Sequence, residues 1–361
     1  MRIAIIYNEI DCTPGTEDWL TRSNGRRDPA KADIHEEAEF GLLRELEFIQ
    51  SSLAQAGHEP VIFGADDSAK LCRFLTKYRP EMVFNCCDAF AGNAALEMNV
   101  AALYEMFDAP YTGSSPLTLG LLLNKPLAKA VLTAHGIKTP AYVVVDRGQS
   151  PLAARHLTFP LIVKPAAEDA SIGIDDGAVV HDESALAKRV RFVWREFGQA
   201  ALVEEFIDGR EFNASVLAVS PGKFVTLAIG EIAYDMLPAG RPQIFGYEAK
   251  WDPTAPFNHA MATRCPAVID KITARRIQRL ATEVAQVVGL RDYGRIDLRI
   301  RNSDQALFVL EVNPNPDLDL ECSFMRAARS SGRTDQGTIC EIVERASERC
   351  DLERAKRQVA E

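Results

Sequence analysis

Residues 295–313 read RIDLRIRNSDQALFVLEVN. Residues 295–300 and 307–313 both alternate between polar and apolar side chains, as strands with one buried face do. The polar residues 301–304 between them have the length of a hairpin turn. The stretch therefore predicts two antiparallel strands joined by a tight turn.

The predicted hairpin places several oxygen-bearing side chains on one face. Because side chains two apart share a face of a strand, we expect Glu311 and Asn313 to point one way, and Leu310 and Val312 to point the other. Asp297 comes from the partner strand. Carboxylate and amide oxygens suit Mg²⁺, a hard cation. An ordinary sheet with one solvated face has the same pattern, so the choice depends on the rest of the chain.

The composition bounds the class of protein. A chain of 361 residues is long enough for two or three domains, and 47% hydrophobic with 25% charged residues is ordinary for a soluble globular protein. A net charge of −10 argues against nonspecific nucleic-acid binding, which relies on a basic surface. The eight cysteines are scattered without a Cys-x-x-Cys pair, so neither a zinc site nor a disulfide framework is predicted.

The chain also lacks the sequence patterns of membrane or secreted proteins. The apolar start at residues 3–7 is too short for a signal peptide. No apolar run approaches the roughly 20 residues that a membrane helix requires. We therefore expect a cytoplasmic protein with reduced thiols and no membrane partner.

Strand and helix patterns alternate from the N-terminus to about residue 113, which favours a parallel α/β domain. The polar residues 8–33 interrupt this alternation and read as a long loop, a feature typical of lids and binding loops. Later residues predict mostly antiparallel strands. We expect an α/β (α+β) fold with units at residues 1–113, 114–208 and 209–361.

The two later units carry several polar residues at positions that could bind a ligand. Lys125 lies on a predicted helix, and Lys164 ends the apolar strand LIVK. A lysine at the end of a buried strand is unusual for a solvated residue, although each lysine alone could be a surface residue. Ser171 lies in the small-residue loop that follows.

The order of these motifs resembles the ATP-grasp superfamily and, within it, the D-alanine–D-alanine ligase family. The motifs are the two lysines, Glu-Glu-Phe-Ile at 204–207, Gly-Arg-Glu ending at Glu211, Arg-Ile-Asp at 295–297 and Glu-Val-Asn at 311–313. Tyr-Thr-Gly-Ser at 111–114 and Tyr-Glu-Ala-Lys at 247–250 are similar to that ligase family in particular. The resemblance implies ATP held between two α+β units, and a carboxylate activated as an acyl phosphate and then attacked by an amine.

The resemblance also implies roles for individual residues. Those implied to bind ATP are Lys125, Lys164, Ser171, Glu204, Glu205, Phe206, Ile207, Glu211 and Lys250. Those implied to hold Mg²⁺, with two ions expected, are Asp297, Glu311 and Asn313. Arg295 and Lys250 would act on the transferred group, with Arg295 stabilising its negative charge. Those implied to contact substrate are Trp251, Asp317 and Ser323.

The substrate side departs from the family pattern. Ala170 and Trp251 stand where the family has a serine and a tyrosine, so two hydroxyls are lost. Asp317 replaces a glycine that allows the backbone to approach the second substrate closely. Its charge disfavours a nearby substrate carboxylate, or else meets a substrate ammonium group. The family's glycine-rich N-terminal loop is replaced by the insertion, after which Glu36 or Glu37 could supply a carboxylate.

These features predict an ATP-dependent carboxylate–amine ligase that forms an amide or peptide bond, and we expect its small-molecule substrates to be amino acids. A D-alanine–D-alanine ligase, an L-amino-acid dipeptide ligase and a ligase of a specialised pathway all remain open. A carboxylation enzyme ranks lower. The alternative of another class is a non-catalytic nucleotide-binding protein, which retention of the metal-ligand residues disfavours. The resemblance suggests a homodimer.

Overall fold

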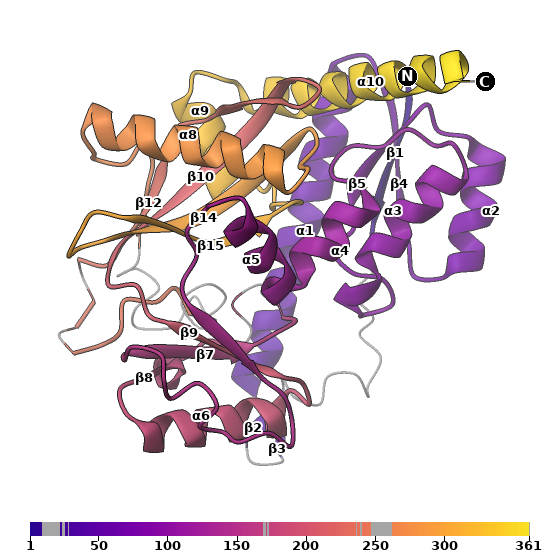
Figure 1. Cartoon of the computed structure of the whole chain (residues 1–361). Helices are drawn as coiled ribbons and strands as arrows, with labels where there is room; N and C mark the ends of the chain where they lie inside the picture. Colours follow the sequence, from indigo (N-terminus) through magenta and orange to yellow (C-terminus); the bar gives the residue numbers. More distant parts are fainter. Residues whose placement is uncertain are drawn as a thin grey trace.

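The computed structural model describes residues 1–8, 22–23, 26–27, 29–168, 171, 173–235, 237–238, 240–246 and 262–360, and only the backbone at 22–23, 26–27, 29–40, 262 and 359–360. Figure 1 shows an N-terminal α/β body beside two further bodies that each contain a sheet, with the C-terminal helix lying across the N-terminal body. Ala170, Lys250 and Trp251, which carried predictions, lie outside the described residues.

The N-terminal sheet is parallel, as the alternating pattern predicted. Its order is β4 (Glu59–Gly64), β1 (Arg2–Tyr7) and β5 (Met82–Cys86). Ile3 and Ile5 belong to a core shared with the C-terminal helices, whereas Ala4 and Ile6 belong to a core on the other face. The second face is covered by α2 (Ser68–Tyr78) and α3 (Glu97–Met106), with η1 at Ala94–Leu96.

The stretch predicted as a loop over residues 8–33 is partly regular, and that prediction is wrong at its C-terminal end. Strands β2 (Arg22–Ser23) and β3 (Arg26–Arg27) pair antiparallel, and α1 runs from Pro29 to Gln55. Proline is well tolerated in the first turn of a helix, because the N–H that it lacks has no partner there. The last five residues of the predicted loop, 29–33, are therefore helical.

The single helix expected around Lys125 is two helices, α4 (Pro116–Leu123) and α5 (Lys125–Ala134). Asn124 separates them, and its side chain accepts a hydrogen bond from the Leu127 amide. Pro126 in the first turn of α5 has no N–H to continue the preceding helix. This break turns α5 so that Ala128 and Leu132 pack in the core of the C-terminal sheet.

The central unit is a four-stranded sheet in the order β6 (Tyr142–Val145), β9 (Ala201–Glu205), β7 (Leu161–Pro165) and β8 (Val179–Val180), with all pairs antiparallel. The short η2 (Asp176–Ala178) precedes β8. Helix α6 (Glu183–Glu196) covers one face, and Asp182 caps it by accepting from the Ala185 amide.

The C-terminal sheet carries the predicted hairpin. Its strands lie in the order β13 (Ala262–Arg264), β12 (Gly230–Ala233), β10 (Gly209–Ser220), β14 (Tyr293–Arg301) and β15 (Leu307–Asn313), with β11 (Lys223–Thr226) beside β10. Every pair is antiparallel. Helix α8 (Lys271–Val287) packs with α5 on the apolar face of this sheet, which leaves the other face for polar side chains.

A β-bulge changes the expected alternation in β15. The register shifts between Asp297 and Leu298, so Asp297 pairs with Glu311 while Leu298 pairs with Val309. Val309 and Val312 therefore both lie in the core, and the prediction that Leu310 would face the core with Val312 is wrong. A bulge inserts one unpaired residue, here Leu310, so simple alternation does not hold across it.

The C-terminal helices join the two ends of the chain. Helices α9 (Ser323–Ser330) and α10 (Asp335–Ala360) contribute Phe324, Met325 and Ile339 to the core that contains Ile3 and Ile5 of β1. No helix among the described residues is long and apolar enough to cross a membrane.

Gly209, where β10 begins, is packed against the neighbouring strand. A β-carbon there would overlap the carbonyl oxygen of Ile300. We predict that Gly209→Ala lowers the free energy of unfolding by more than about 2 kcal/mol, measured by urea denaturation. The control is Gly41→Ala in α1, where nothing lies near the new methyl group and a gain of about 0.5–1 kcal/mol is expected. Equal effects of the two changes would contradict the pairing of β10 with β14 at this point.

Candidate active site

The polar face of the C-terminal sheet centres on Asp297. Arg295 donates from Nε and Nη2 to the two carboxylate oxygens of Asp297, each at 2.9 Å. Asn213 Nδ2 donates to the same carboxylate at 2.6 Å, and Asn313 Nδ2 donates at 3.0 Å. Asp297 therefore has its orientation fixed from three strands. Asn213 was missed by the sequence reasoning, although its position two residues after Glu211 in an alternating strand places it on the same face.

Glu311 lies opposite Asp297 in the register and meets a lysine from a helix. The Lys125 ammonium is 2.5 Å from Glu311 Oε1. The Lys125 residue is only 8% exposed, because α5 packs onto the apolar side of the sheet beside this strand. The structure thus brings together a residue predicted to bind phosphate and a residue predicted to bind metal.

Arg295 is held in its charged form. Burial lowers the pKa of its guanidinium, but the adjacent Asp297 carboxylate outweighs that effect and the pKa lies above its ordinary value. Its Nη1 also donates to Ser323 Oγ at 3.4 Å, at the start of α9. Arg295 can therefore stabilise negative charge but cannot serve as a proton donor. Arg295 and Ser323, predicted separately, lie together.

A second cluster of charges is buried between α5 and the central sheet. The Glu204 carboxylate is 2.6 Å from Lys129 Nζ and 2.8 Å from Lys164 Nζ. Burial raises the pKa of Glu204, but the two lysines outweigh burial and the pKa lies below its ordinary value. Burial is also the main cause that lowers the pKa of Lys129. Lys129 additionally donates to Thr139 Oγ1 at 2.6 Å.

Lys129 was given no role by the sequence reasoning. The available signal was its spacing, because residues four apart share a helix face and Lys125 had already been selected. With Lys129, the helix supplies two lysines to two different carboxylates, Glu311 and Glu204.

Glu211, predicted to reach the ribose of ATP, is engaged by an arginine that the sequence reasoning missed. Arg299 donates from Nε at 2.9 Å and from Nη2 at 2.6 Å to Glu211 Oε2, which also accepts from the Tyr234 hydroxyl at 2.8 Å. Arg299 Nη1 donates to the Ile207 carbonyl, and its guanidinium lies 4.8 Å from the centre of the Phe206 ring. Residues 204–207, predicted to bind ATP, and Glu211 therefore meet at Arg299, which lies two residues after Asp297 on β14 and so on the same face.

Two other predicted nucleotide contacts have local partners. Ser171 adopts a left-handed backbone conformation and donates from Oγ to the Phe245 carbonyl at 3.0 Å. Glu205 accepts from the Thr158 amide at 2.8 Å, which places it on the opposite side of β9 from Glu204.

Asp317 lies beside α1 of the N-terminal unit. It accepts from Cys322 Sγ at 3.0 Å, and the neighbouring Glu45 accepts from the Leu318 amide at 3.0 Å. Burial and then the charge of Asp317 raise the pKa of Glu45 well above its ordinary value. The residue that departs from the family pattern is therefore part of an acidic pair with the N-terminal unit, not of the Asp297 network.

The oxygen donors on the sheet face fit a hard divalent cation. Asp297, Glu311 and Asn313 offer two carboxylates and one amide oxygen from adjacent strands, which is the donor type that Mg²⁺ prefers. No group of three or more His, Cys, Asp or Glu side chains within the described part of the chain could hold a metal ion.

The chain is similar to known proteins over most of its length. The family model described as D-ala D-ala ligase C-terminus matches residues 131–344. A D-alanine--D-alanine ligase from Marinomonas sp. is 33% identical over 262 residues, which cover 71% of this chain and 74% of that protein. A D-alanine--D-alanine ligase from Syntrophotalea carbinolica is 30% identical, with 84% and 89% covered. An uncharacterized protein, y4sG, from Sinorhizobium fredii is 30% identical, with 83% and 87% covered.

Solved structures share the fold along almost the whole chain. D-alanine--D-alanine ligase from Bacillus anthracis, complexed with ATP, aligns with a TM-score of 0.71 at 18% identity, covering 98% of this chain and 99% of that one. The Coxiella burnetii ligase aligns with a TM-score of 0.68 at 16% identity, covering 99% and 97%.

This chain belongs to the D-ala D-ala ligase family. It is an ATP-grasp ligase, an enzyme that forms an amide bond at the expense of ATP. The predicted α/β ATP-grasp fold, the enzyme class and the use of ATP are thereby confirmed.

The buried Glu204 cluster generates a stability prediction. Glu204→Gln leaves two buried ammonium groups without their counter-charge, so we expect a loss of about 3 kcal/mol in the free energy of unfolding at pH 7. Glu205→Gln is the matched control, because Glu205 is half-buried and accepts a single amide hydrogen bond. Urea denaturation of both variants measures the difference, and equal losses would rule out the buried pairing.

The same pair predicts a pH dependence. Because the pKa of Glu204 is lowered in the folded protein, its stabilising effect is present above the ordinary carboxyl pKa of about 4.3 and is lost as pH falls through the lower, folded value. The stability gap between wild type and Glu204→Gln should therefore shrink as the pH is lowered from 6 towards about 3. A gap that stays constant over this range would show that the Glu204 charge does not matter.

Proposed function

We propose that this enzyme joins two amino acids, activating the carboxylate of one as an acyl phosphate for attack by the amine of the other. The division into units at residues 1–113, 114–208 and 209–361 is part of the proposal. The observation that carries it is the Lys125–Glu311 contact, which places a cationic group suited to phosphate beside a carboxylate suited to Mg²⁺. Phosphoryl transfer depends mainly on such positioning and charge neutralisation.

Asp297, Glu311 and Asn313 would hold two Mg²⁺ ions. Their support is the register of the hairpin, which sets Asp297 opposite Glu311 and Arg295 opposite Asn313. When bound, Mg²⁺ supplies neutralisation of the negative charge on the ATP phosphates.

The chain's own cations would act at defined places. Lys164, at the end of β7, and Lys125, at the start of α5, would bind phosphate oxygens of ATP. Lys250 would approach the terminal phosphate. Arg295, permanently charged and aimed at the polar sheet face, would stabilise negative charge on the acyl phosphate and on the intermediate formed by amine attack.

The remaining predicted contacts would complete the pockets. Glu204 to Ile207 would line the adenine, Glu211 would reach the ribose by exchanging its present partners, and Ser171 would cover the phosphates. Ser323, which already contacts Arg295, would meet the substrate together with Trp251 and Asp317. Asp317 and Glu45 give this side an acidic character, so we propose that an ammonium group of a substrate approaches Asp317, whereas the amine that attacks the acyl phosphate reacts in its neutral form.

The assembly and location of the enzyme are proposed on the family assignment alone. We propose a homodimer in the cytoplasm, with no nucleic-acid or membrane partner. The acidic composition, with a net charge of −10, supports the lack of a nucleic-acid partner.

The direct test is phosphate release from Mg-ATP with D- and L-amino acids, singly and in pairs, with mass detection of the product. A dipeptide-mass product with stoichiometric phosphate would support the proposal and identify the substrates. No phosphate release across the panel, with ATP still bound, would refute amino acids as the substrates.

The metal-binding role of Glu311 predicts a specific loss. Glu311→Gln removes one carboxylate ligand and the counter-charge of Lys125, so we expect kcat to fall by roughly a hundredfold or more while the far-ultraviolet circular dichroism is unchanged. Asp304→Asn is the control, because Asp304 pairs with Arg301 at the exposed turn of the same hairpin. Full activity in Glu311→Gln would remove Glu311 from the metal site.

Asp317 predicts a change of substrate preference. Asp317→Gly removes its charge beside Glu45, so the ratio of kcat/KM between amino-acid acceptors should change by roughly tenfold or more while the KM for ATP changes little. The exposed Glu321→Gln in the same segment is the control. Loss of ATP binding with preference retained would place Asp317 outside the substrate pocket.

A further inference from the structure

The C-terminal half of α10 lies past the family match. The match ends at residue 344, whereas α10 continues to Ala360. This part of the helix carries Arg349, which is only 5% exposed. A surface helix does not need a buried arginine, so its partners indicate what the segment does.

Arg349 forms a buried ion pair with Asp292. Its Nε and Nη2 donate to the two carboxylate oxygens of Asp292, each at 3.0 Å, and Asp292 is 2% exposed. Burial lowers the pKa of Arg349, but the Asp292 carboxylate outweighs burial and the pKa lies above its ordinary value. Both groups are therefore charged, and the two-pronged geometry fixes their relative orientation.

The pair also holds the segment that leaves the N-terminal sheet. Arg349 Nη2 donates to the Tyr111 carbonyl at 2.6 Å, and the Gly113 amide donates to Asp292 Oδ2 at 2.8 Å. Tyr111 forms a bridge with Val83 of β5. Arg349 and Asp292 thus connect three parts of the chain: the exit from the N-terminal sheet, the start of β14 and α10.

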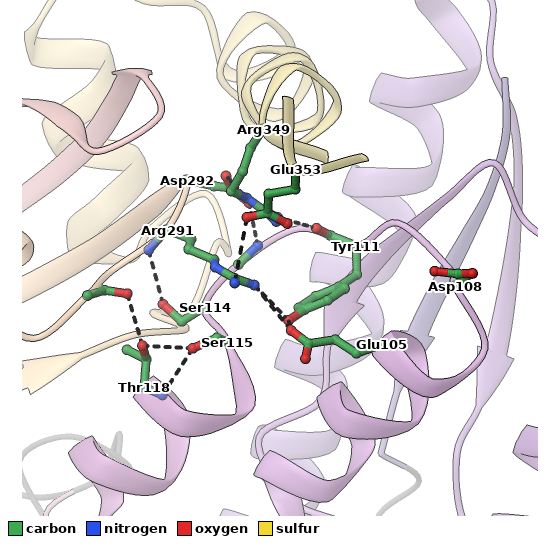
Figure 2. Close-up of polar contacts among 12 residues, drawn as sticks. Glu105, Asp108, Tyr111, Ser114, Ser115, Thr118, Arg291, Asp292, Arg349 and Glu353 are labelled. Atoms are coloured by element: carbon green, nitrogen blue, oxygen red, sulfur yellow. Dashed lines mark hydrogen bonds and ion pairs between the residues drawn. The ribbon is translucent and has the colours of Figure 1, made fainter. Parts of the chain in front are cut away.

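An outer layer of contacts surrounds this pair, as Figure 2 shows. Arg291 donates to the Tyr111 hydroxyl at 3.0 Å and lies 3.4 Å from Glu105 of α3. Glu353, one turn after Arg349, lies 3.6 Å from both arginines. Two arginines, Arg291 and Arg349, thus lie near Tyr111, and each is paired with carboxylates.

Asp292 is close in sequence to the candidate active site. It directly precedes β14, whose Arg295 and Asp297 form the centre of the polar sheet face. Asp292 adopts a left-handed backbone conformation, with φ of 49°, which side chains rarely take up. The ion pair thus fixes an unusual backbone conformation where the active-site strand begins.

We propose that Arg349 and Asp292 are positioning residues that set the N-terminal unit relative to the strand bearing Arg295 and Asp297, so that α10 acts as an internal clamp for the ligase reaction. This proposal rests on the proposed function for its catalytic consequence. A buried ion pair adds little net stability compared with apolar packing, whereas its directed hydrogen bonds fix geometry. Geometry is what a reaction between two bound substrates requires.

The first test is hydrogen–deuterium exchange on full-length Arg349→Met, which requires no turnover. We expect faster amide exchange in residues 111–118 and 291–297 and unchanged exchange in β9 of the central sheet. Arg357→Met is the matched control, since Arg357 lies on the same helix but pairs at 3.4 Å with the exposed Asp108. Exchange equal to wild type in both segments would overturn the proposal, whether or not the wild type is active on the amino-acid panel.

The second test separates positioning from general stability. In Arg349→Met we expect kcat to fall by roughly tenfold or more, with the KM for ATP within about twofold, at a temperature where the variant is fully folded. Arg349→Lys, which keeps the charge but has a single donor nitrogen, should recover only part of kcat. Arg357→Met should retain wild-type kcat. An unchanged kcat in folded Arg349→Met would overturn the catalytic part of the proposal.

A double-variant cycle tests whether the two residues act as a pair. Asp292→Gly removes the carboxylate while glycine accepts the left-handed conformation. If the residues act together, the double variant Asp292→Gly/Arg349→Met should lose no more kcat than the worse single variant. Losses that multiply would show two independent effects and contradict the pairing. Failure of wild type on the whole substrate panel would instead count against the proposed function, leaving the exchange result to decide on the clamp.

Discussion

The pairing of two carboxylates on one sheet face is the constraint on which the site depends. Asp297 and Glu311 lie opposite each other in adjacent strands, where like charges repel. Arg295 opposes the first carboxylate and Lys125 opposes the second. Because Lys125 comes from α5, the charge balance of the sheet face requires that helix to hold a definite place.

The apolar residues that alternate with the charged ones fix the position of α5. The residues of β14 between the charged ones, Ile296 and Leu298, form one core with Ala128 and Leu132 of α5. Packing beneath the sheet thus fixes the helix whose first residue reaches Glu311. The bulge in β15 allows Val309 to lie in the core while Glu311 lies on the polar face. Without the bulge, these two residues would share a face.

The sequence predicted the hairpin and the parallel N-terminal sheet, since both follow from local periodicity. It did not predict the bulge, because one extra residue is invisible in a short alternating run. It also left Lys129 and Arg299 without roles, although they neutralise Glu204 and Glu211. Partners of buried charges come from distant segments, so periodicity can show that a charge is buried but not what opposes it.

The nucleotide side of the site is a set of neutralised lysines. Lys125 contacts Glu311, and Lys164 shares Glu204 with Lys129. Phosphate binding at these lysines would therefore exchange one anion for another. Such an exchange avoids the desolvation cost of bringing a new charge to an uncompensated buried cation. On the substrate side, Asp317 and Glu45 form an acidic pair, in which burial and then the charge of Asp317 raise the pKa of Glu45. The two sides therefore favour different ligands. On the nucleotide side the lysines are already paired with carboxylates, whereas the acidic substrate side favours a positively charged group.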